Sequence, residues 1–194
     1  MTGKAKVLTP IEVRQVVSLL KNNRDKTLFL TGLYTGLRIS ELVALRHDQL
    51  FKPNGTVMES LHLARPKIKQ TIHCTIPIHP ELRGQLVAYK SSFLDRLVST
   101  EDNSKWLFPA INEPDKHIGR VHAHNILTQA FKEVGLAGAT THSMRRTCLT
   151  LMARAGVPMR TIQELSGHSN LSQLQSYLEL DPADRHWAIL TLKF

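Results

Sequence analysis

Several features common in other protein classes are scarce in this sequence. Its 194 residues include two cysteines, Cys74 and Cys148, which are too few for a disulfide framework and suit a reducing compartment. No run of 18 or more apolar residues occurs, and residues 1–9 lack the apolar core of a signal peptide. We therefore expect a cytoplasmic protein that does not span a membrane, with both cysteines in its core.

Two common enzyme motifs are also missing. No glycine-rich loop ends in Lys-Ser or Lys-Thr, which argues against nucleotide hydrolysis by that route. Neither a His-Glu-x-x-His motif nor a close cluster of Asp and Glu is present, which argues against a catalytic metal pair. His122 and His124 stand two residues apart, and we expect them on the surface near the start of a helix. The sequence predicts no metal and no cofactor.

The sequence has a surplus of positive charge. Lys and Arg total 25 against 16 Asp and Glu, which gives a net charge of +9 and an isoelectric point near 9.8. Such a surplus indicates a polyanionic partner, with nucleic acid first and an acidic membrane surface second. The membrane is disfavoured because no predicted helix combines a Lys/Arg-lined polar face with a broad apolar face.

The apolar pattern predicts mostly helix with one small antiparallel β-sheet, an α+β fold in one domain spanning residues 1–194. A hydroxyl cap at Thr9, followed by Pro10 and Glu12, predicts the start of the first helix. Strands are expected at 56–58, 60–63 and 71–78, and residues 106–108 as a buried anchor. The other helices are expected at 25–37, 40–45, from 80 onward, and at 122–134, 143–155, 159–165, 169–180 and 182–192.

Three segments contain residues that could carry chemistry. Arg38 stands at the junction of two short helices, His142 and Arg145 are three apart on one helical face, and His168 is followed nine residues later by Tyr177. Each has an ordinary structural explanation when it is taken alone. Arg38 could pack its stem on the core, His142 could begin a helix, His168 could cap a turn and Tyr177 could be a core residue.

Taken together, the three segments resemble the catalytic motifs of the tyrosine recombinases, the phage integrase family of site-specific DNA recombinases. The matching segments are Thr-Gly-Leu-Arg-Ile-Ser-Glu-Leu (35–42), His-Ser-Met-Arg-Arg-Thr (142–147), and Leu-Ser-Gly-His-Ser-Asn-Leu-Ser (165–172) with Tyr177. The resemblance spans about Leu8 to Asp181. It implies the family's catalytic-domain fold and an enzyme that cuts and rejoins DNA through a 3′-phosphotyrosine intermediate, without metal or ATP.

The resemblance assigns a role to each residue. Tyr177 is the nucleophile, His142 accepts its proton, and Lys67 protonates the leaving 5′-oxygen, with Lys69 as the alternative lysine. Arg38, Arg145 and His168 donate to the phosphate. Planar, permanently charged guanidinium groups suit this task because negative charge grows on the non-bridging oxygens in the transition state. Glu41 is expected to be structural and to hold an arginine.

We expect further DNA contacts from Arg65, Lys69, Arg146 and Arg160, most of them to the DNA backbone and strongly dependent on salt. The resemblance also implies a homo-oligomer on double-stranded DNA, in the form of a tetramer. A C-terminal tail at residues 182–194 could pack on its own domain, but the resemblance favours docking onto the neighbouring subunit. The sequence starts almost at the catalytic domain. We therefore expect either an isolated domain, from which the family's usual N-terminal core-binding domain is absent, or one of the short single-domain members, which resemble the bacterial inversion recombinases of fimbrial phase switching. In both cases accessory DNA-bending proteins are expected.

Two other functions remain open at this point. Residues 161–177 could form a helix-turn-helix of a non-catalytic DNA-binding regulator. The same catalytic residues could also serve a nicking and closing enzyme like the type IB topoisomerases, which relaxes DNA without exchanging strands.

Overall fold

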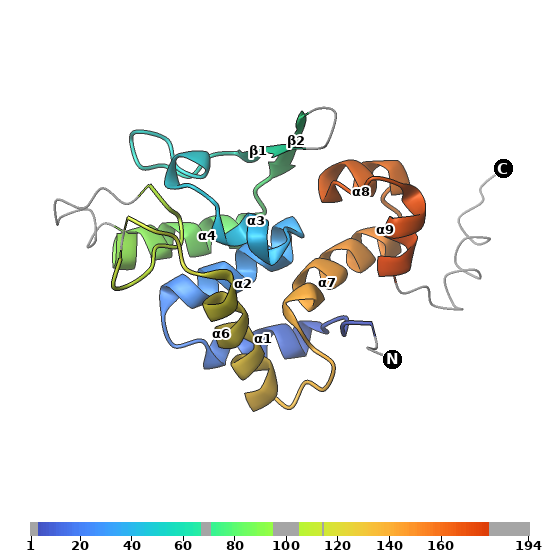
Figure 1. Cartoon of the computed structure of the whole chain (residues 1–194), viewed down its shortest axis with the longest axis horizontal. Coiled ribbons are helices and arrows are strands. Elements are labelled where there is room, and N and C mark those ends of the chain that lie inside the picture. Colours follow the sequence, from blue (N-terminus) through green and yellow to red (C-terminus); the bar gives the residue numbers. More distant parts are fainter. Residues whose placement is uncertain (1–3, 67–70, 95–104, 114, 179–194) are drawn as a thin grey trace.

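Helices dominate the part of the chain that the computed structural model describes, residues 4–66, 71–94, 105–113 and 115–178 (Figure 1). Its strands pair as one antiparallel hairpin, which confirms the predicted fold class. In chain order the elements are α1 (Pro10–Leu19), α2 (Asn23–Thr35), α3 (Ile39–Val43), a 3₁₀ turn η1 (His47–Gln49), β1 (Ser60–Pro66), β2 (Thr71–Pro77), α4 (Pro80–Tyr89), a π-helical turn η2 (Lys90–Leu94), α6 (Arg120–Glu133), α7 (Thr141–Arg154), α8 (Met159–Ser166) and α9 (Leu171–Tyr177).

Local capping sets the starts of the first two helices. The Thr9 hydroxyl accepts a hydrogen bond from the Glu12 amide at 3.3 Å, and the Glu12 carboxylate accepts from the Thr9 amide at 2.8 Å. This reciprocal pair confirms the start predicted for α1. Asn22 caps α2, so that helix begins two residues before the expected start at Asp25. Gly36 ends α2 in the left-handed conformation, with φ of 63°.

The β-hairpin alternates buried and exposed side chains. Leu61 pairs with Ile76, and Leu63 with Cys74, and all four side chains are buried. This period of two is what a half-buried strand requires. The third strand expected at 56–58 is not formed, because that segment contributes only an isolated bridge between Val57 and Phe51. Too few backbone bonds form there to continue a ladder.

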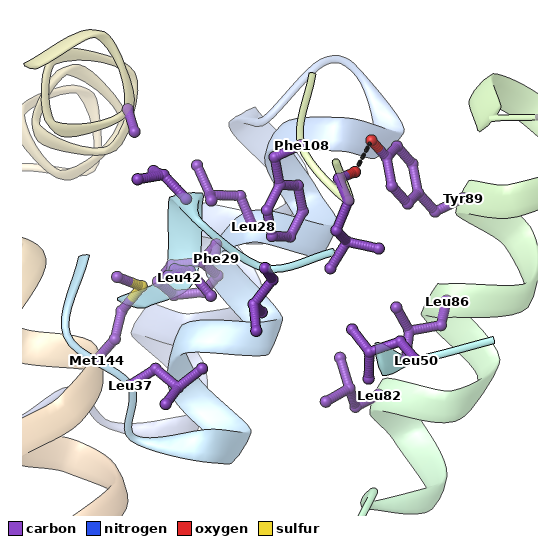
Figure 2. Packing of buried hydrophobic residues seen from close by; sticks show 14 of the residues in the cluster. Leu28, Phe29, Leu37, Leu42, Leu50, Leu82, Leu86, Tyr89, Phe108 and Met144 are labelled. Carbon is purple, nitrogen blue, oxygen red and sulfur yellow. Dashed lines mark hydrogen bonds between the residues drawn. The ribbon is translucent and has the colours of Figure 1, made fainter. Parts of the chain in front are cut away.

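The main hydrophobic core lies between α2 and α4 (Figure 2). Leu28 and Phe29 come from α2, and Tyr89 from the end of α4 packs its ring 6.1 Å from that of Phe108. The Tyr89 hydroxyl donates to the Leu107 carbonyl at 2.7 Å, so its polar end is satisfied inside the core. Leu107 and Phe108 are fully buried, as predicted, whereas Trp106, the third residue of the expected anchor, is only half-buried.

Helix α7 belongs to two cores. Its Met144 joins the main core and lies close to α2, where a Cβ on Gly32 would stand only 2.8 Å from the Met144 sulfur. One turn later, Leu149 packs with Ile162 of α8 and with Leu174 and Leu178 at α9 in a second, smaller cluster. Helices α8 and α9 both pack on α7 (Figure 1), and α8 also contacts β2 of the hairpin.

The C-terminal helices differ from the sequence-based boundaries. Helix α7 begins at Thr141, so His142 lies inside it, and α9 covers 171–177 instead of the expected 169–180. The backbone becomes extended at Leu178, which ends α9. The helix expected at 182–192 falls outside the described residues. Cys74 and Cys148 are both buried, as predicted. In the described part, no helix has the length and apolar character needed to cross a bilayer.

Candidate active site

The residues of the three sequence motifs meet around the first half of α7. Arg38 caps the start of α3, His142 and Arg145 lie on α7, His168 follows the end of α8, and Tyr177 is the last residue of α9. The left-handed Gly167, with φ of 69°, turns the chain after α8 so that His168 faces α7. Elements that are more than one hundred residues apart in the sequence thus contribute to one site.

Arg145 is the most deeply buried of these residues, with 1% of its surface exposed. Its guanidinium donates to the Gly36 carbonyl at 2.6 Å and to the Ser166 carbonyl at 2.8 Å. Burial and the nearby charge of Arg38 lower the pKa of Arg145 to about 10, so the group remains protonated at neutral pH. Its Nε is buried and has no hydrogen-bond partner among the described residues.

His168 is 5% exposed and lies between Arg145 and Ser166. Its Nε2 is 3.2 Å from an Arg145 nitrogen, and its Nδ1 is 2.8 Å from the Ser166 hydroxyl. Burial, followed by the charge of Arg145, lowers the pKa of His168 to about 4, so the ring is neutral at pH 7. A neutral ring with its proton on Nδ1 accepts from Arg145 and donates to Ser166, which satisfies both nitrogens.

The Tyr177 side chain lies over this buried pair. Its ring centroid is 5.7 Å from the Arg145 Cζ and 5.0 Å from the His168 ring. Its hydroxyl is 3.4 Å from Nδ1 of the exposed His142, a distance at the long end for a hydrogen bond. Partial desolvation, then the charges of Arg145 and Arg38, lower the pKa of His142. A neutral imidazole beside a phenol hydroxyl is able to accept its proton.

Glu41 holds two arginines at the edge of the site, which confirms the structural role expected for it. One carboxylate oxygen is 2.8 Å from Nε of Arg65 and 3.7 Å from Arg38. The other oxygen accepts from the Arg38 amide at 2.8 Å. Arg38 keeps 40% of its side chain exposed, so its guanidinium is held near Arg145 yet open to a ligand.

Two arginines expected to contact DNA are instead buried and bonded within the protein. Arg65 is 8% exposed and donates to Glu41 and to the Leu165 carbonyl at 2.9 Å. Arg146 is 7% exposed; its Nε donates to the Tyr177 carbonyl at 3.0 Å and its Nη1 to the Ala5 carbonyl. These contacts favour positioning roles for both, because each guanidinium joins segments of the protein that are distant in the sequence.

The remaining predicted residues are placed as follows. Arg160 is exposed near the start of α8. Lys67 and Lys69 lie outside the described residues, between the last residue of β1 and the first of β2. His122 and His124 are exposed in the first turns of α6, as predicted. Among the described residues, no three His, Cys, Asp or Glu side chains gather as a metal would require.

Sequence reasoning missed two groups that shape the site. Ser166 orients the His168 ring, and the only sequence signal was its place two residues before that histidine. The carbonyl of Gly36 accepts from Arg145 because α2 ends there, and a backbone acceptor leaves no trace in the choice of side chains.

Comparisons with known proteins identify the family of the chain. The model of the phage integrase family matches residues 6–184. The chain is 33% identical over 178 residues to the tyrosine recombinase XerA of Pyrococcus horikoshii, which covers 90% of this chain and 57% of that protein. It is 29% identical over 185 residues to the tyrosine recombinase XerC of Roseiflexus sp. (strain RS-1), covering 92% of this chain and 56% of that one. The chain thus spans a little over half the length of these relatives.

Solved structures show the same fold. The crystal structure of a XerA recombinase superposes with a TM-score of 0.76 at 19% identity, over 99% of this chain and 67% of that one. A XerH site-specific recombinase, bound to a palindromic difH substrate in a post-cleavage complex, superposes with a TM-score of 0.69 at 16% identity, over 97% of this chain and 53% of that one. Because the family model matches nearly the whole described chain, which also has the fold of these recombinases, the chain belongs to the phage integrase family.

Proposed function

We propose that this chain is the catalytic domain of a tyrosine-type site-specific DNA recombinase, which cuts and rejoins DNA through a covalent 3′-phosphotyrosine intermediate. The single observation that carries the proposal is the contact of the Tyr177 hydroxyl with His142, at 3.4 Å, above the buried guanidinium of Arg145. A phenol paired with a base beside fixed positive charge is the arrangement that nucleophilic attack on a phosphodiester needs.

In the proposed reaction, the Tyr177 oxygen attacks the phosphorus while its proton passes to Nδ1 of His142. The bond from phosphorus to the 5′-oxygen breaks, and Lys67 gives that oxygen a proton, a role that rests on the family resemblance. Arg38 and Arg145 bind the non-bridging oxygens, whose negative charge is greatest in the transition state. Removing one such donor typically lowers the rate by about 10²–10³-fold. Attack of a 5′-hydroxyl on the phosphotyrosine reverses every step and reseals the strand.

In this proposal, His168 changes from a hydrogen-bond acceptor to a donor when DNA binds. Without DNA its Nε2 accepts from Arg145, whereas the resemblance requires it to donate to phosphate. A phosphate in the site raises the pKa of His168 and thereby favours the doubly protonated, donating ring. The buried Nε of Arg145 gains a partner from the same phosphate, which removes the cost of an unpaired donor.

The contacts of the α8–α9 turn support catalysis over the helix-turn-helix regulator. In a regulator of that kind the second helix lies in the major groove, with side chains free to read bases. Here His168, which precedes α9, and Tyr177, its last residue, are turned toward Arg145 and His142. We therefore retain the regulator only as an outcome of the test.

A suicide duplex tests the proposal. Nicked substrates made from the DNA that flanks the gene should trap the wild-type protein as an adduct stable to denaturant, because the cut fragment diffuses away before religation. Tyr177→Phe should abolish the adduct. Tyr34→Phe is the matched control, because Tyr34 on α2 bonds Glu81 away from the site. Binding without an adduct would identify a regulator, and relaxation of supercoils without strand exchange a topoisomerase-like enzyme.

The proposal includes self-association on DNA in the cytoplasm, with accessory DNA-bending proteins. A mostly apolar groove of about 890 Å³, lined in part by Leu8, Leu33, Ile78 and Met152, could receive an apolar segment. The tail, which lies outside the described residues, ends in the sequence Trp-Ala-Ile-Leu-Thr-Leu-Lys-Phe, and we propose that the tail of a neighbouring copy occupies the groove. Deleting residues 184–194 should weaken assembly on DNA in gel-shift titrations, and unchanged complexes would remove this proposal.

A further inference from the structure

We infer that Arg146 is a positioning residue for the nucleophile: it clamps the end of α9, at the backbone of Tyr177, to the chain segment that precedes α1. The inference rests on the proposed function only for its catalytic consequence. It replaces the sequence-based expectation that Arg146 contacts DNA.

The clamp consists of two backbone acceptors that share one buried guanidinium. Nε of Arg146 donates to the carbonyl of Tyr177 at 3.0 Å, and Nη1 donates to the carbonyl of Ala5. The Tyr177 carbonyl lies at the end of a helix, where carbonyls have no partner within the helix. A cation at this end is also favoured by the helix dipole. With 7% of Arg146 exposed, water competes poorly for either acceptor.

The segment on the other side of the clamp is itself held firmly. The Lys6 amide donates to the Gly138 carbonyl at 3.0 Å, and the Leu8 amide donates to the Thr147 hydroxyl at 2.8 Å. Leu8 is 2% exposed and joins the main core. Arg146 therefore connects the backbone of Tyr177 to the segment before α1, which is itself held against α7 and the main core.

Helix α9 needs such a tie. It has seven residues, and a helix this short is marginal unless tertiary contacts hold it. Its apolar attachment is the small cluster that contains Leu174 and Leu178. Both of those residues flank Tyr177 without fixing its carbonyl. A cavity of about 370 Å³, lined by Ala5, His142, Arg146 and Tyr177 among others, leaves the phenol room to move if the clamp is released.

The test is Arg146→Met, which keeps the apolar stem and removes the donors. Losing a charged hydrogen bond should reduce the correctly placed population by about 10- to 100-fold, so the single-turnover rate of adduct formation should fall by that factor at saturating DNA. The dissociation constant for DNA and its salt dependence should change less than twofold. Arg146→Lys, which retains one charged donor, should recover part of the rate.

Arg83→Met is the matched control. Arg83 also donates to two backbone carbonyls, those of Val57 at 2.9 Å and Met58 at 3.0 Å, but it joins α4 to the segment before β1 and has no part in the candidate site. Thermal melting should show that Arg83→Met destabilises the fold about as much as Arg146→Met does. At a temperature where all variants are folded, Arg83→Met should leave the rate of adduct formation unchanged.

Removing residues 1–5 probes the second half of the clamp, since the Ala5 carbonyl is lost. The truncation should slow adduct formation in the wild-type background and add nothing to Arg146→Met. Hydrogen exchange should become at least tenfold faster for the amides of residues 171–178 in Arg146→Met, and remain unchanged in Arg83→Met.

The outcomes separate the alternatives. An adduct rate within twofold of wild type in Arg146→Met would overturn the inference, and a weaker affinity with a shallower salt slope would return Arg146 to DNA contact. An equal loss of rate in Arg83→Met would also overturn it, because the effect would then be general destabilisation. If the wild-type protein forms no adduct, the proposed function fails. Hydrogen exchange of the α9 amides in Arg146→Met then still tests whether Arg146 holds the end of α9.

Discussion

Replacing His168 by glutamine should remove a defined part of the pH dependence of stability. The ordinary pKa of a histidine is near 6.5, and in the native protein burial and Arg145 lower that of His168 to about 4. Between these values the unfolded chain binds more protons than the folded chain, so the free energy of unfolding falls as the pH is lowered from about 6.5 to about 4. Over that whole window the loss amounts to about 3 kcal/mol, at about 1.36 kcal/mol per pKa unit.

Urea unfolding at pH 7.5 and pH 5.0 measures the effect. At pH 7.5 the ring is neutral in both states and contributes no pH dependence, whereas at pH 5.0 about 2 kcal/mol should have been lost in the wild type. Glutamine retains an acceptor for Arg145 but does not titrate, so His168→Gln should lose about 2 kcal/mol less over the same interval.

His122→Gln provides the control, because His122 is exposed on α6 and its replacement should leave the wild-type difference intact. If the wild type and His168→Gln lose equal stability between the two pH values, the ring is not held neutral. The arrangement of acceptor and donor nitrogens inferred for it would then be wrong.

Three further predictions concern packing, charge and catalysis. Gly32→Ala should destabilise the fold by about 1–3 kcal/mol, because the new Cβ would meet the Met144 sulfur at 2.8 Å. Gly84→Ala is the control and should be neutral or stabilising, because its Cβ would meet nothing within 4 Å. Equal shifts of the two urea midpoints would refute this prediction. Arg65→Met should cost about 2 kcal/mol of stability by removing the ion pair with Glu41 and the hydrogen bond to the Leu165 carbonyl. Exposed Arg160→Met should change stability by less than about 0.5 kcal/mol and reduce the salt slope of DNA binding by about one. Since desolvation and nearby guanidinium groups lower the pKa of His142, the rate of adduct formation should hold as the pH falls through 6.5 and decline only below it; a decline that begins above 6.5 would contradict its role as the base.

Local sequence signals were enough for the helices whose ends are set by their own side chains. The capping pair of Thr9 and Glu12 acts within four residues, so the start of α1 could be read directly. The end of α9 could not. Leu178 continues the apolar spacing of that helix, but its backbone turns extended because the side chain packs into the small cluster of α7 and α8.

The candidate site was likewise predictable only in part from the sequence. The spacing of His142 and Arg145 already placed both on one face of a helix, and the family resemblance supplied the partners from distant segments. The sequence could not reveal that Arg65 and Arg146 point inward. An arginine bonded to a backbone carbonyl, such as that of Leu165 or Tyr177, has the same local sequence as one facing DNA, because the acceptor belongs to a segment brought near only by folding.

The division of the interior into two unequal cores has a consequence for how the reactivity of this domain can change. Arg38 lies beside the large core. His168 and Tyr177 belong instead to the α8–α9 region, which is held by the small cluster of Leu149, Ile162, Leu174 and Leu178. Substitutions confined to the α8–α9 region should therefore change how often the Tyr177 hydroxyl is correctly placed, while the main core stays folded. Under the proposed function, the timing of strand cleavage and the stability of the fold are therefore expected to be separable traits, open to selection or to engineering one at a time.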